Sequence, residues 1–335
     1  MSFKKLEKPD AKTLELIVKS GDMDFNVAMA AQLELTKALT SPLREGVLVG
    51  DVVRSIYEPR VLPPGTEIEF PLDLLAPGAE NEHVAYTNPG NGRIAERQVE
   101  ADYVKVPTYS IASAIDWLLR HAREARWDLV GRAMQVLEAG FVKKINDDGW
   151  HTLLSAAADR NILVFDADAT PGQFTKRLVS LMKTIMRRNG GGNTASIKRG
   201  RLTDLFMSPE GIEDIRNWGL DQIDETTRRE IYQSADGGIT RIFNVNLHDL
   251  DELGEQQEYQ NFFTSNLGAS LNTGDLELVI GLDMMNNDSF LMPIKQEVTI
   301  FADPMLHRQQ RAGVYGWGDF GFAVLDARRV MAGSY

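Results

Sequence analysis

The stretch that decides the fold is SIASAIDWLLRHAREARWDLVGRAMQVLEAGFVKKINDD, residues 110–148. Thr108 and Ser110 are candidate N-caps, and Asp148-Gly149 is the candidate end of the element. Apolar residues recur every three to four positions, as on one face of an α-helix. They are Ile111, Ile115, Leu118, Ala122, Ala125, Leu129, Ala133, Val136 or Leu137, and Ile145. The pattern predicts one helix of about 57 Å, at about 1.5 Å per residue.

The segment before this helix, residues 51–108, has the two-residue period of β-strands. Ile68, Phe70 and Leu72 alternate with Glu67, Glu69 and Pro71, and Val99, Ala101 and Tyr103 alternate on the return. Turn signals stand at Pro63-Pro64-Gly65, Pro77-Gly78 and residues 88–92. The segment predicts a long two-stranded arm. An isolated hairpin is marginally stable in water, so we expect the arm to rest on another subunit or, alternatively, on its own domain.

Residues 1–50 predict two helices. Asp10 is the candidate cap of the first helix, which ends at Ser20-Gly21, and Asp24 is the candidate cap of the second. Ser41-Pro42 is the expected end of the second helix, because the residue before a proline disfavours the α region. The pair is either an ordinary part of a core or an arm that docks on another subunit.

The middle of the chain predicts an α/β unit. Thr170-Pro171-Gly172-Gln173 has the form of a capping box at the start of a helix that ends at Asn189. Residues 190–192 are three glycines, which break the chain. The elements expected after them are a strand at 202–207, a helix after Ser208-Pro209, a helix from Asp224 and a strand at 240–247.

The last fifth of the chain is rich in strand signals. Apolar residues alternate over 276–282 and 294–300. Residues 313–322 alternate glycine with aromatic residues, which favours a tight hairpin with close backbone approach, and they lead into 323–325.

Composition narrows the function classes. The chain has 335 residues, 43% of them hydrophobic, which is more than one average domain and enough for a sizeable core. Its formal net charge of -12 argues against a dedicated nucleic-acid-binding surface. It has no cysteine, so disulfides and thiolate metal sites are excluded. Neither a signal peptide nor an apolar run of membrane-spanning length is present in the sequence.

A search for catalytic motifs finds none. The five histidines have no metal-ligand spacing, and Gly190 to Thr194 lacks the Lys-Ser/Thr of a P-loop. Asp283, Asp288 and Asp303 form no calcium loop. We therefore expect no enzyme activity, no metal and no cofactor. The one basic cluster is Arg187, Arg188, Lys198, Arg199 and Arg201, which is either a solvated face or a pore-lining or DNA-facing surface.

The order of these parts resembles the major capsid proteins of tailed bacteriophages with the HK97-type fold. The residues that carry the resemblance best are Gly50 to Asp148 and Gly281 to Met331. The resemblance implies an α+β capsid fold. Its parts would be an N-terminal arm at 1–50, an E-loop β arm at 51–108, a P domain with the spine helix at 109–195, an A domain at 196–290 and closing strands shared by both domains at 291–335.

The resemblance also implies a function. Such a protein self-assembles into pentamers and hexamers that form an icosahedral or prolate head around the phage genome. It is located in the virion capsid, is assembled in the host cytoplasm, and has no catalytic residue and no membrane partner. Its partners would be other copies of itself, a portal protein, a decoration or cement protein, and packaged DNA by non-specific proximity.

Two departures from the family pattern matter. Only about fifty residues precede the β arm, so a separate scaffolding protein is expected. Residues 38–104 contain no lysine, so the arm cannot form the Lys–Asn crosslink that some relatives use. Noncovalent burial or an added cement protein would then hold the shell together.

The candidate contacts between subunits are charged residues of the arm and of the middle unit. They are Glu67, Glu69, Arg93, Arg97, Arg187, Arg188, Lys198, Arg199, Arg201, Glu210, Glu213 and Asp214. The resemblance puts residues 187–201 near the symmetry axis of each capsomer, with the three acidic residues after Ser208 as charge partners. Two alternatives stay open: an encapsulin-like compartment, and an oligomeric α/β enzyme with its site near 187–201.

Overall fold

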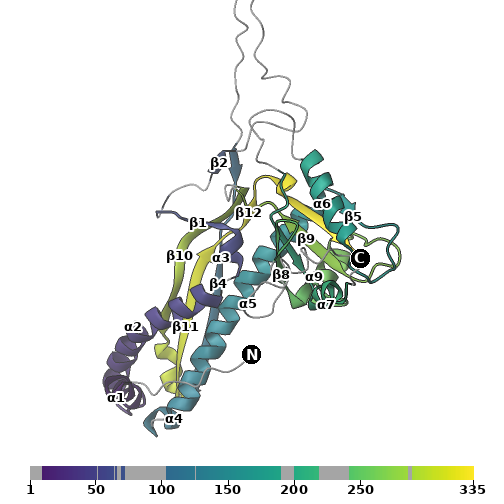
Figure 1. The fold of residues 1–335 in the computed structure, drawn as a ribbon. Helices are drawn as coiled ribbons and strands as arrows, with labels where there is room; N and C mark the ends of the chain where they lie inside the picture. Colours follow the sequence, from purple (N-terminus) through teal and green to yellow (C-terminus); the bar gives the residue numbers. More distant parts are fainter. Residues whose placement is uncertain are drawn as a thin grey trace, which may run out of the picture. The chain divides into compact units, whose positions relative to one another are not determined.

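The computed structural model divides the chain into two compact units (Figure 1). Unit 1 consists of Met1–Ile68, Lys105–Gly149 and Met292–Phe322, and unit 2 consists of Glu69–Val104, Trp150–Leu291 and Ala323–Tyr335. The residues that the structure describes are 10–50, 52–63, 65, 69–71, 103–124, 126–189, 200–218, 241–285 and 289–335. The predicted helix from Asp224, the three glycines at 190–192 and most of the predicted β arm lie outside these residues.

Unit 1 is built on a sheet whose three long strands pair antiparallel. The strand order is β1-β10-β11-β4, and β12 pairs with the start of β10. Its strands are β1 (Glu58–Val61), β4 (Tyr109–Leu118), β10 (Phe290–Ala302) and β11 (Arg311–Phe320). The short strand β12 (Ala323–Val324) and the first two residues of β10, with which it pairs, belong to unit 2. The register of β4 against β11 is regular along their whole length, from Tyr109↔Phe320 to Leu118↔Arg311. This regular pairing fixes which side chains share each face of the sheet.

Helices complete unit 1. They are α1 (Ala11–Ser20), α2 (Phe25–Gly50), α3 (Val53–Ile56), α4 (Leu119–Arg123), the first part of α5 (Trp127–Asp159) and the 3-10 segment η5 (Pro304–Gln309). The α1–α2 pair confirms the predicted N-terminal helices, and Asp24 caps α2 by accepting from the Asn26 N–H at 3.0 Å. The predicted end at Ser41-Pro42 is wrong, because α2 continues through Pro42 to Gly50. Leu43 and Val47 beyond the proline are buried, and this burial outweighs the hydrogen bond that Pro42 cannot donate.

The predicted helix over 110–148 is wrong at both ends. Residues 109–118 form β4, which has the exposed-and-buried alternation of a strand, and α5 begins only at Trp127. The candidate caps Thr108 and Ser110 therefore begin no helix. At the other end, α5 passes Asp148-Gly149 and continues to Asp159, because Trp150, Leu153 and Leu154 are buried in unit 2. The central part of the prediction, one long helix through residues 127–148, is confirmed.

Unit 2 is built on a mixed six-stranded sheet. Its strand order is β5-β13-β9-β6-β8-β7, with β13·β5 and β6·β8 parallel and the other pairs antiparallel. The strands are β5 (Leu163–Val164), β6 (Asp204–Met207), β7 (Arg241–Ile242), β8 (Val245–Asp249), β9 (Leu278–Leu282) and β13 (Val330–Ser334). A separate two-stranded ribbon pairs β2 (Glu69–Pro71) with β3 (Tyr103–Lys105), which agrees with the start and the return of the predicted arm.

The helix α6 (Lys176–Asn189) covers this sheet with a stripe of buried residues at helical spacing: Leu178, Val179, Met182 and Met186. The other helical elements of unit 2 among the described residues are the last part of α5, α7 (Pro209–Asn217), α9 (Glu258–Asn261), the π-helical turn η3 (Phe262–Asn266) and the 3-10 turns η2 (Asp251–Leu253) and η6 (Ala327–Arg329). The predicted start of α7 is confirmed, because the Ser208 hydroxyl accepts from the Gly211 N–H.

The predicted capping box at Thr170 is wrong. Gln173 N–H donates to Thr170 O at 3.1 Å, and Gly172 has a φ of +77°, so Thr170 to Gln173 form a turn with proline and glycine at its two central positions. The cap of α6 is Thr175, whose Oγ1 accepts from the Leu178 N–H at 3.2 Å. The proline and glycine that suggested a helix start are instead the residues that this turn requires.

Two predicted strands differ in detail from the structure. The strand predicted at 240–247 is a hairpin of β7 and β8, with Phe243 and Asn244 at positive φ in the turn. The glycine-aromatic run 313–322 lies mostly in β11 and is not a tight hairpin. Its close approaches are to neighbouring strands and to α5, where Phe141 packs over Gly316. Among the described helices, none is both long enough and apolar enough to cross a membrane.

Candidate functional site

The face of the unit 1 sheet that points away from Phe141 carries three aromatic rings in contact. Because side chains alternate along a strand, Tyr315 and Trp317 lie opposite to Gly316, and Phe301 pairs with Tyr315 across β10 and β11. The ring centroids of Phe301 and Trp317 are 4.8 Å apart, and those of Tyr315 and Trp317 are 5.6 Å apart. We call Phe301, Tyr315 and Trp317 the aromatic face.

The neighbouring strand leaves this aromatic face accessible. Trp317 pairs with Ala112 and Tyr315 with Ala114, so only methyl groups stand beside the rings on β4. Trp317 is 38% exposed. An exposed Trp supported by two other rings is the kind of residue that anchors protein interfaces.

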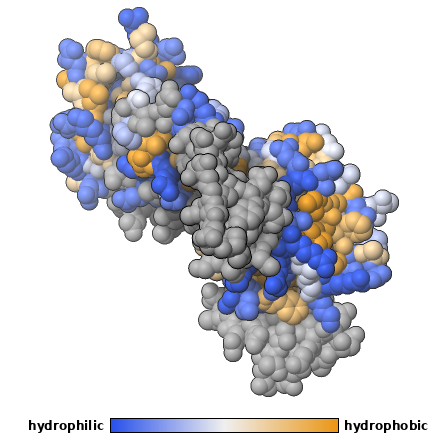
Figure 2. Space-filling model, turned by 90° about the horizontal axis from the view of Figure 1, so that it is seen from above, coloured by the Kyte–Doolittle hydropathy of each residue, from blue (hydrophilic) through white to orange (hydrophobic). Residues whose placement is uncertain are grey.

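Further apolar side chains are exposed at the N-terminal helices. Met23 is 78% exposed, and Phe25 and Val27 at the start of α2 are also exposed. In the space-filling view, hydrophobic patches interrupt the hydrophilic surface (Figure 2). Large exposed apolar patches mark interaction surfaces in soluble proteins. The predicted role of the α1–α2 pair as an arm between subunits remains a prediction.

A second feature is a cleft in unit 2 with a volume of about 1050 Å³. Five positively charged residues line it: Lys183, Arg187, Arg188, Arg201 and Arg241. Thr184, Thr203, Asn244, Asn246, Gly200, Leu202 and Met285 complete the described lining. We call this cleft the basic groove. No carboxylate is among the described residues that line it.

The sequence placed three of these five cations together and missed two. Arg187, Arg188 and Arg201 belong to the predicted basic cluster, whereas Lys198 and Arg199 lie outside the described residues. Lys183 is one helical turn before Arg187, and its Nζ donates to Phe243 O at 2.7 Å. Arg241 is forty residues downstream of Arg201, and only the pairing of β7 with β8 and of β8 with β6 brings it to the groove.

The acidic residues predicted as partners of this cluster lie on α7. Glu213 pairs with Arg216 at 3.1 Å, and Asp214 Oδ2 accepts from the Phe174 N–H at 2.8 Å. Among the described residues, no ion pair joins Glu210, Glu213 or Asp214 to the basic groove. Of the predicted arm contacts, Glu69 is exposed on β2, and Glu67, Arg93 and Arg97 lie outside the described residues.

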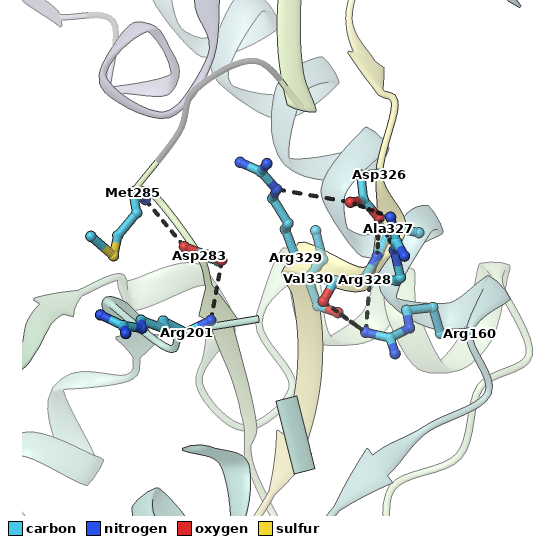
Figure 3. A network of polar contacts seen from close by, with 9 residues as sticks. All are labelled: Arg160, Arg201, Asp283, Met285, Asp326, Ala327, Arg328, Arg329 and Val330. Atoms are coloured by element: carbon cyan, nitrogen blue, oxygen red, sulfur yellow. Dashed lines mark hydrogen bonds and ion pairs between the residues drawn. The ribbon is translucent and has the colours of Figure 1, made fainter. Parts of the chain in front are cut away.

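The groove lies next to a network of buried charges (Figure 3). Asp283 is 1% exposed and accepts from the backbone N–H of Arg201 at 3.1 Å and of Met285 at 3.2 Å. Burial raises the pKa of the Asp283 carboxyl, although these two hydrogen bonds oppose the rise. Asp283 thus binds the backbone of Arg201, a residue that also lines the groove.

The rest of this network ties η6 and the start of β13 to Arg160, the residue that follows α5. Arg160 Nη1 donates to the carbonyl oxygens of Ala327, Arg328 and Val330 at 3.0–3.3 Å. Arg328 binds Asp326 through two nitrogens, at 2.8 and 3.1 Å. These groups hold the start of β13, so we assign them to the fold. In the described part of the chain, no group of three or more His, Asp or Glu side chains could hold a metal ion.

A second buried polar centre joins α7 to β9 and to Tyr335. Tyr335 Oη donates to Glu277 Oε2 at 2.5 Å, the Ser208 hydroxyl also donates to Glu277, and the two hydroxyl oxygens are 2.8 Å apart. Burial raises the pKa of the Glu277 carboxyl, and the nearby charges of Glu210 and Asp214 add to the rise. The two hydroxyl donors oppose it but do not cancel it. Ser208 is needed as the helix cap, so this centre is structural.

Comparison with known proteins supports the fold. No protein-family model and no curated protein sequence matches the chain. Among solved structures, a chain from Microbacterium phage Oxtober96 matches with a TM-score of 0.53 at 10% identity, over 85% of this chain and 90% of that chain. A chain of the Cyanophage Pam1 capsid asymmetric unit matches with a TM-score of 0.53 at 14% identity, over 81% of this chain and 84% of that chain.

These likenesses confirm the fold class that the order of elements predicted. The chain has an α+β capsid fold of the HK97 type. At 10–14% identity the likeness establishes the fold and leaves the roles of single residues to be argued from this structure.

Proposed function

We propose that this protein is the major capsid protein of a tailed bacteriophage. Its copies assemble into the pentamers and hexamers of an icosahedral or prolate head that encloses the genome. The observation that carries this proposal is the capsid fold, matched over 81% of this chain by a chain of a phage capsid asymmetric unit. A shell subunit acts by contact with its neighbours, so we infer a structural role without catalysis.

The proposal includes the predicted partners and location. Other copies of the chain are the principal partners, and a separate scaffolding protein, a portal protein and a decoration or cement protein are the others. The mature protein would lie in the virion capsid after assembly in the host cytoplasm. Residues 1–50 and 51–108 would be the segments that reach neighbouring subunits.

The aromatic face is our candidate for one contact between copies. Phe301, Tyr315 and Trp317 offer a rigid apolar surface, and Ala112 and Ala114 leave room beside it. The partner is a second copy, because a closed shell made of one chain must cover each contact surface with another copy. Trp317 would be the central residue of this contact.

Electron microscopy of the purified full-length protein tests the assignment. We expect closed shells of uniform size, formed by the protein alone or with a scaffolding protein. The variant Trp317→Thr keeps a residue suited to a strand, and we expect it to reduce shell yield at least about tenfold and to shift the melting temperature by less than about 4 °C. Phe165→Thr is the matched control, because Phe165 is a similarly exposed aromatic residue (40%) in unit 2.

The outcomes separate the two claims. Absence of shells under all conditions, with or without scaffolding protein, would contradict the proposed function. Normal shells from Trp317→Thr, or equal losses from both variants, would contradict only the role of the aromatic face.

A further inference from the structure

The basic groove is a local exception on an acidic protein. The whole chain has a formal net charge of -12, with 48 acidic residues against 36 basic ones. The groove nevertheless gathers Lys183, Arg187, Arg188, Arg201 and Arg241, with no carboxylate among its described lining residues. Five like charges in one cleft repel each other unless an anion compensates them.

These cations come from three separate parts of the fold. Lys183, Arg187 and Arg188 stand on the last turns of α6, Arg201 precedes β6, and Arg241 is on β7. Arg187 and Arg188 alone would be explained by a helix C-terminus, which favours basic residues. That explanation does not cover Arg201 and Arg241, which lie on other elements and line the same cleft.

We propose that the basic groove binds a strand of nucleic acid through its phosphate groups. This inference rests on the proposed function, because a shell that encloses a genome exposes its subunits to nucleic acid at a very high local concentration. The groove would give the otherwise acidic subunit a defined contact with that nucleic acid.

The chemistry of the lining fits a phosphate backbone. Four of the five cations are arginines, whose planar forks match phosphate oxygens. Asn244 adds a neutral polar group of the kind that contacts phosphate and sugar in protein–DNA interfaces. The side chains of Thr203 and Asn246 also line the groove, but they already donate to Leu282 O and to Asp204 Oδ1. Leu202 and Met285 supply an apolar part of the lining for sugar or base.

The dimensions favour a polymer over a single small anion. Ligand pockets for small molecules have volumes of about 300–1,000 Å³, and the groove exceeds that range at about 1050 Å³. One phosphate ion would leave most of the five charges uncompensated. A strand with one charge per nucleotide can meet several of them at once.

Fluorescence anisotropy of a 5′-labelled single-stranded dT20 oligonucleotide tests the proposal with the full-length protein. The NaCl concentration is varied from 50 to 200 mM. Each phosphate contact to a single strand contributes about -0.7 to the slope of log K against log salt. If each of the five cations contacts one phosphate, we expect a slope of about -3.5 for the unaltered protein and about -2.1 for Arg201→Ser/Arg241→Ser. The affinity of this double variant should be at least about tenfold lower at 50 mM salt.

The matched control is Arg177→Ser/Arg216→Ser. It removes the same charge from unit 2 at two exposed arginines, which form ion pairs with Asp168 and Glu213 outside the groove. We expect the control to retain the affinity within about twofold. A loss of equal size in both variants would show that only the total charge matters, and the groove would not be the site.

Further outcomes decide what the groove is for. No binding of dT20 at 50 mM NaCl overturns the proposal. Displacement of dT20 by poly-L-glutamate at equal charge concentration also overturns it, because the groove would then fit an acidic protein segment. A lower melting temperature of Arg201→Ser/Arg241→Ser, without a change in dT20 affinity, would mean that these arginines serve the subunit's own fold.

Assembly is measured on the same samples by electron microscopy. Shells that form but do not bind dT20 through the groove would contradict this inference and leave the proposed function intact. Binding of dT20 through the groove by a protein that forms no shells would contradict the proposed function and leave the binding role of the groove intact.

Discussion

At the scale of single residues, the sequence revealed the helix caps Asp24 and Ser208 but not the buried polar groups. Ser208 before Pro209 was a readable helix start, and the structure confirms it. Nothing in the sequence indicated that the Ser208 hydroxyl would also meet Glu277 and Tyr335, which are 69 and 127 positions away. Strand pairing between β9 and β13 brings these residues together, and no local pattern encodes that pairing.

Glu277 gives a prediction about pH. Burial raises the pKa of its carboxyl in the folded state, so folding favours the protonated form. The stability that depends on this proton is complete below the ordinary pKa of glutamate, and it is lost as the pH rises through the raised pKa. Between the ordinary and the raised pKa, we therefore expect the free energy of unfolding of the unaltered protein to fall relative to that of Glu277→Gln. Above the raised pKa, the difference between the two proteins should level off.

Urea unfolding at a series of pH values from 4 to 8 measures this difference. Subtracting the two proteins removes the titration of groups that both contain. Parallel curves for the two proteins across the whole series would contradict the raised pKa.

At the scale of elements, the main error was the boundary between strand and helix at residues 110–126. Ile111 and Ile115 are four positions apart, which places them on one face of a helix but also on one face of a strand. The pairing of β4 with β11 decides for the strand, and Ser113 and Trp117 join the same inward face. Pairing with a partner two hundred residues away cannot be read from the local period, so this part of the fold could not be predicted.

Gly149 caused the second error at this scale. The sequence predicts the end of the long helix at this glycine, yet α5 continues through it. Its missing side chain makes room for Val53, because a Cβ there would lie 3.0 Å from Val53 Cγ2 and closer still to Cγ1. Close packing of α3 on α5, and not termination, explains this glycine.

This packing predicts opposite effects for two glycines of one helix. Gly149→Ala should lower the free energy of unfolding by about 1–3 kcal/mol, because the new methyl overpacks against Val53. Gly140→Ala should raise it by about 0.5–1 kcal/mol, because a Cβ there meets nothing within 4 Å and alanine favours the helix. Chemical denaturation of both variants measures the difference.

The double variant Val53→Ala/Gly149→Ala serves as the check on the cause. Its free energy of unfolding should be higher than the sum of the two single changes predicts. Val53→Ala removes the methyl groups that the new Cβ at position 149 would clash with, and that Cβ fills the space that Val53 leaves. Additive effects would show that Gly149 matters for a reason other than its contact with Val53.

At the scale of the whole molecule, the order of parts could be read although several boundaries could not. A helical pair, a long helix, an α/β unit and closing strands follow one another in the described residues, and the capsid fold is confirmed. Most of the predicted arm lies outside the described residues and stays a prediction. The candidate site was only partly visible. Arg187, Arg188 and Arg201 are close in sequence, whereas Arg241 and the aromatic face depend on strand pairing.

The arm gives a prediction about assembly. Residues 72–100, between β2 and β3, can be replaced by two glycines so that the β2–β3 ribbon remains. We expect a soluble protein with an unchanged far-ultraviolet circular dichroism melting curve that forms no shells in electron micrographs, because we propose that the arm contacts a neighbouring subunit. Normal shell yield would make the arm dispensable for assembly.

The absence of crosslinking chemistry gives a prediction about how the shell is held together. The chain has no cysteine, and no lysine lies between Lys37 and Lys105. Disulfides are therefore excluded, and an amide crosslink from the arm has no amine to supply it. We therefore expect the contacts between subunits to be noncovalent, as the exposed ring of Trp317 on the aromatic face suggests. Shells boiled in detergent should give one band near 37 kDa on a denaturing gel. A ladder of multimers that persists after boiling would require a covalent bond from lysines outside the arm, and it would show that apolar burial alone does not stabilise the shell.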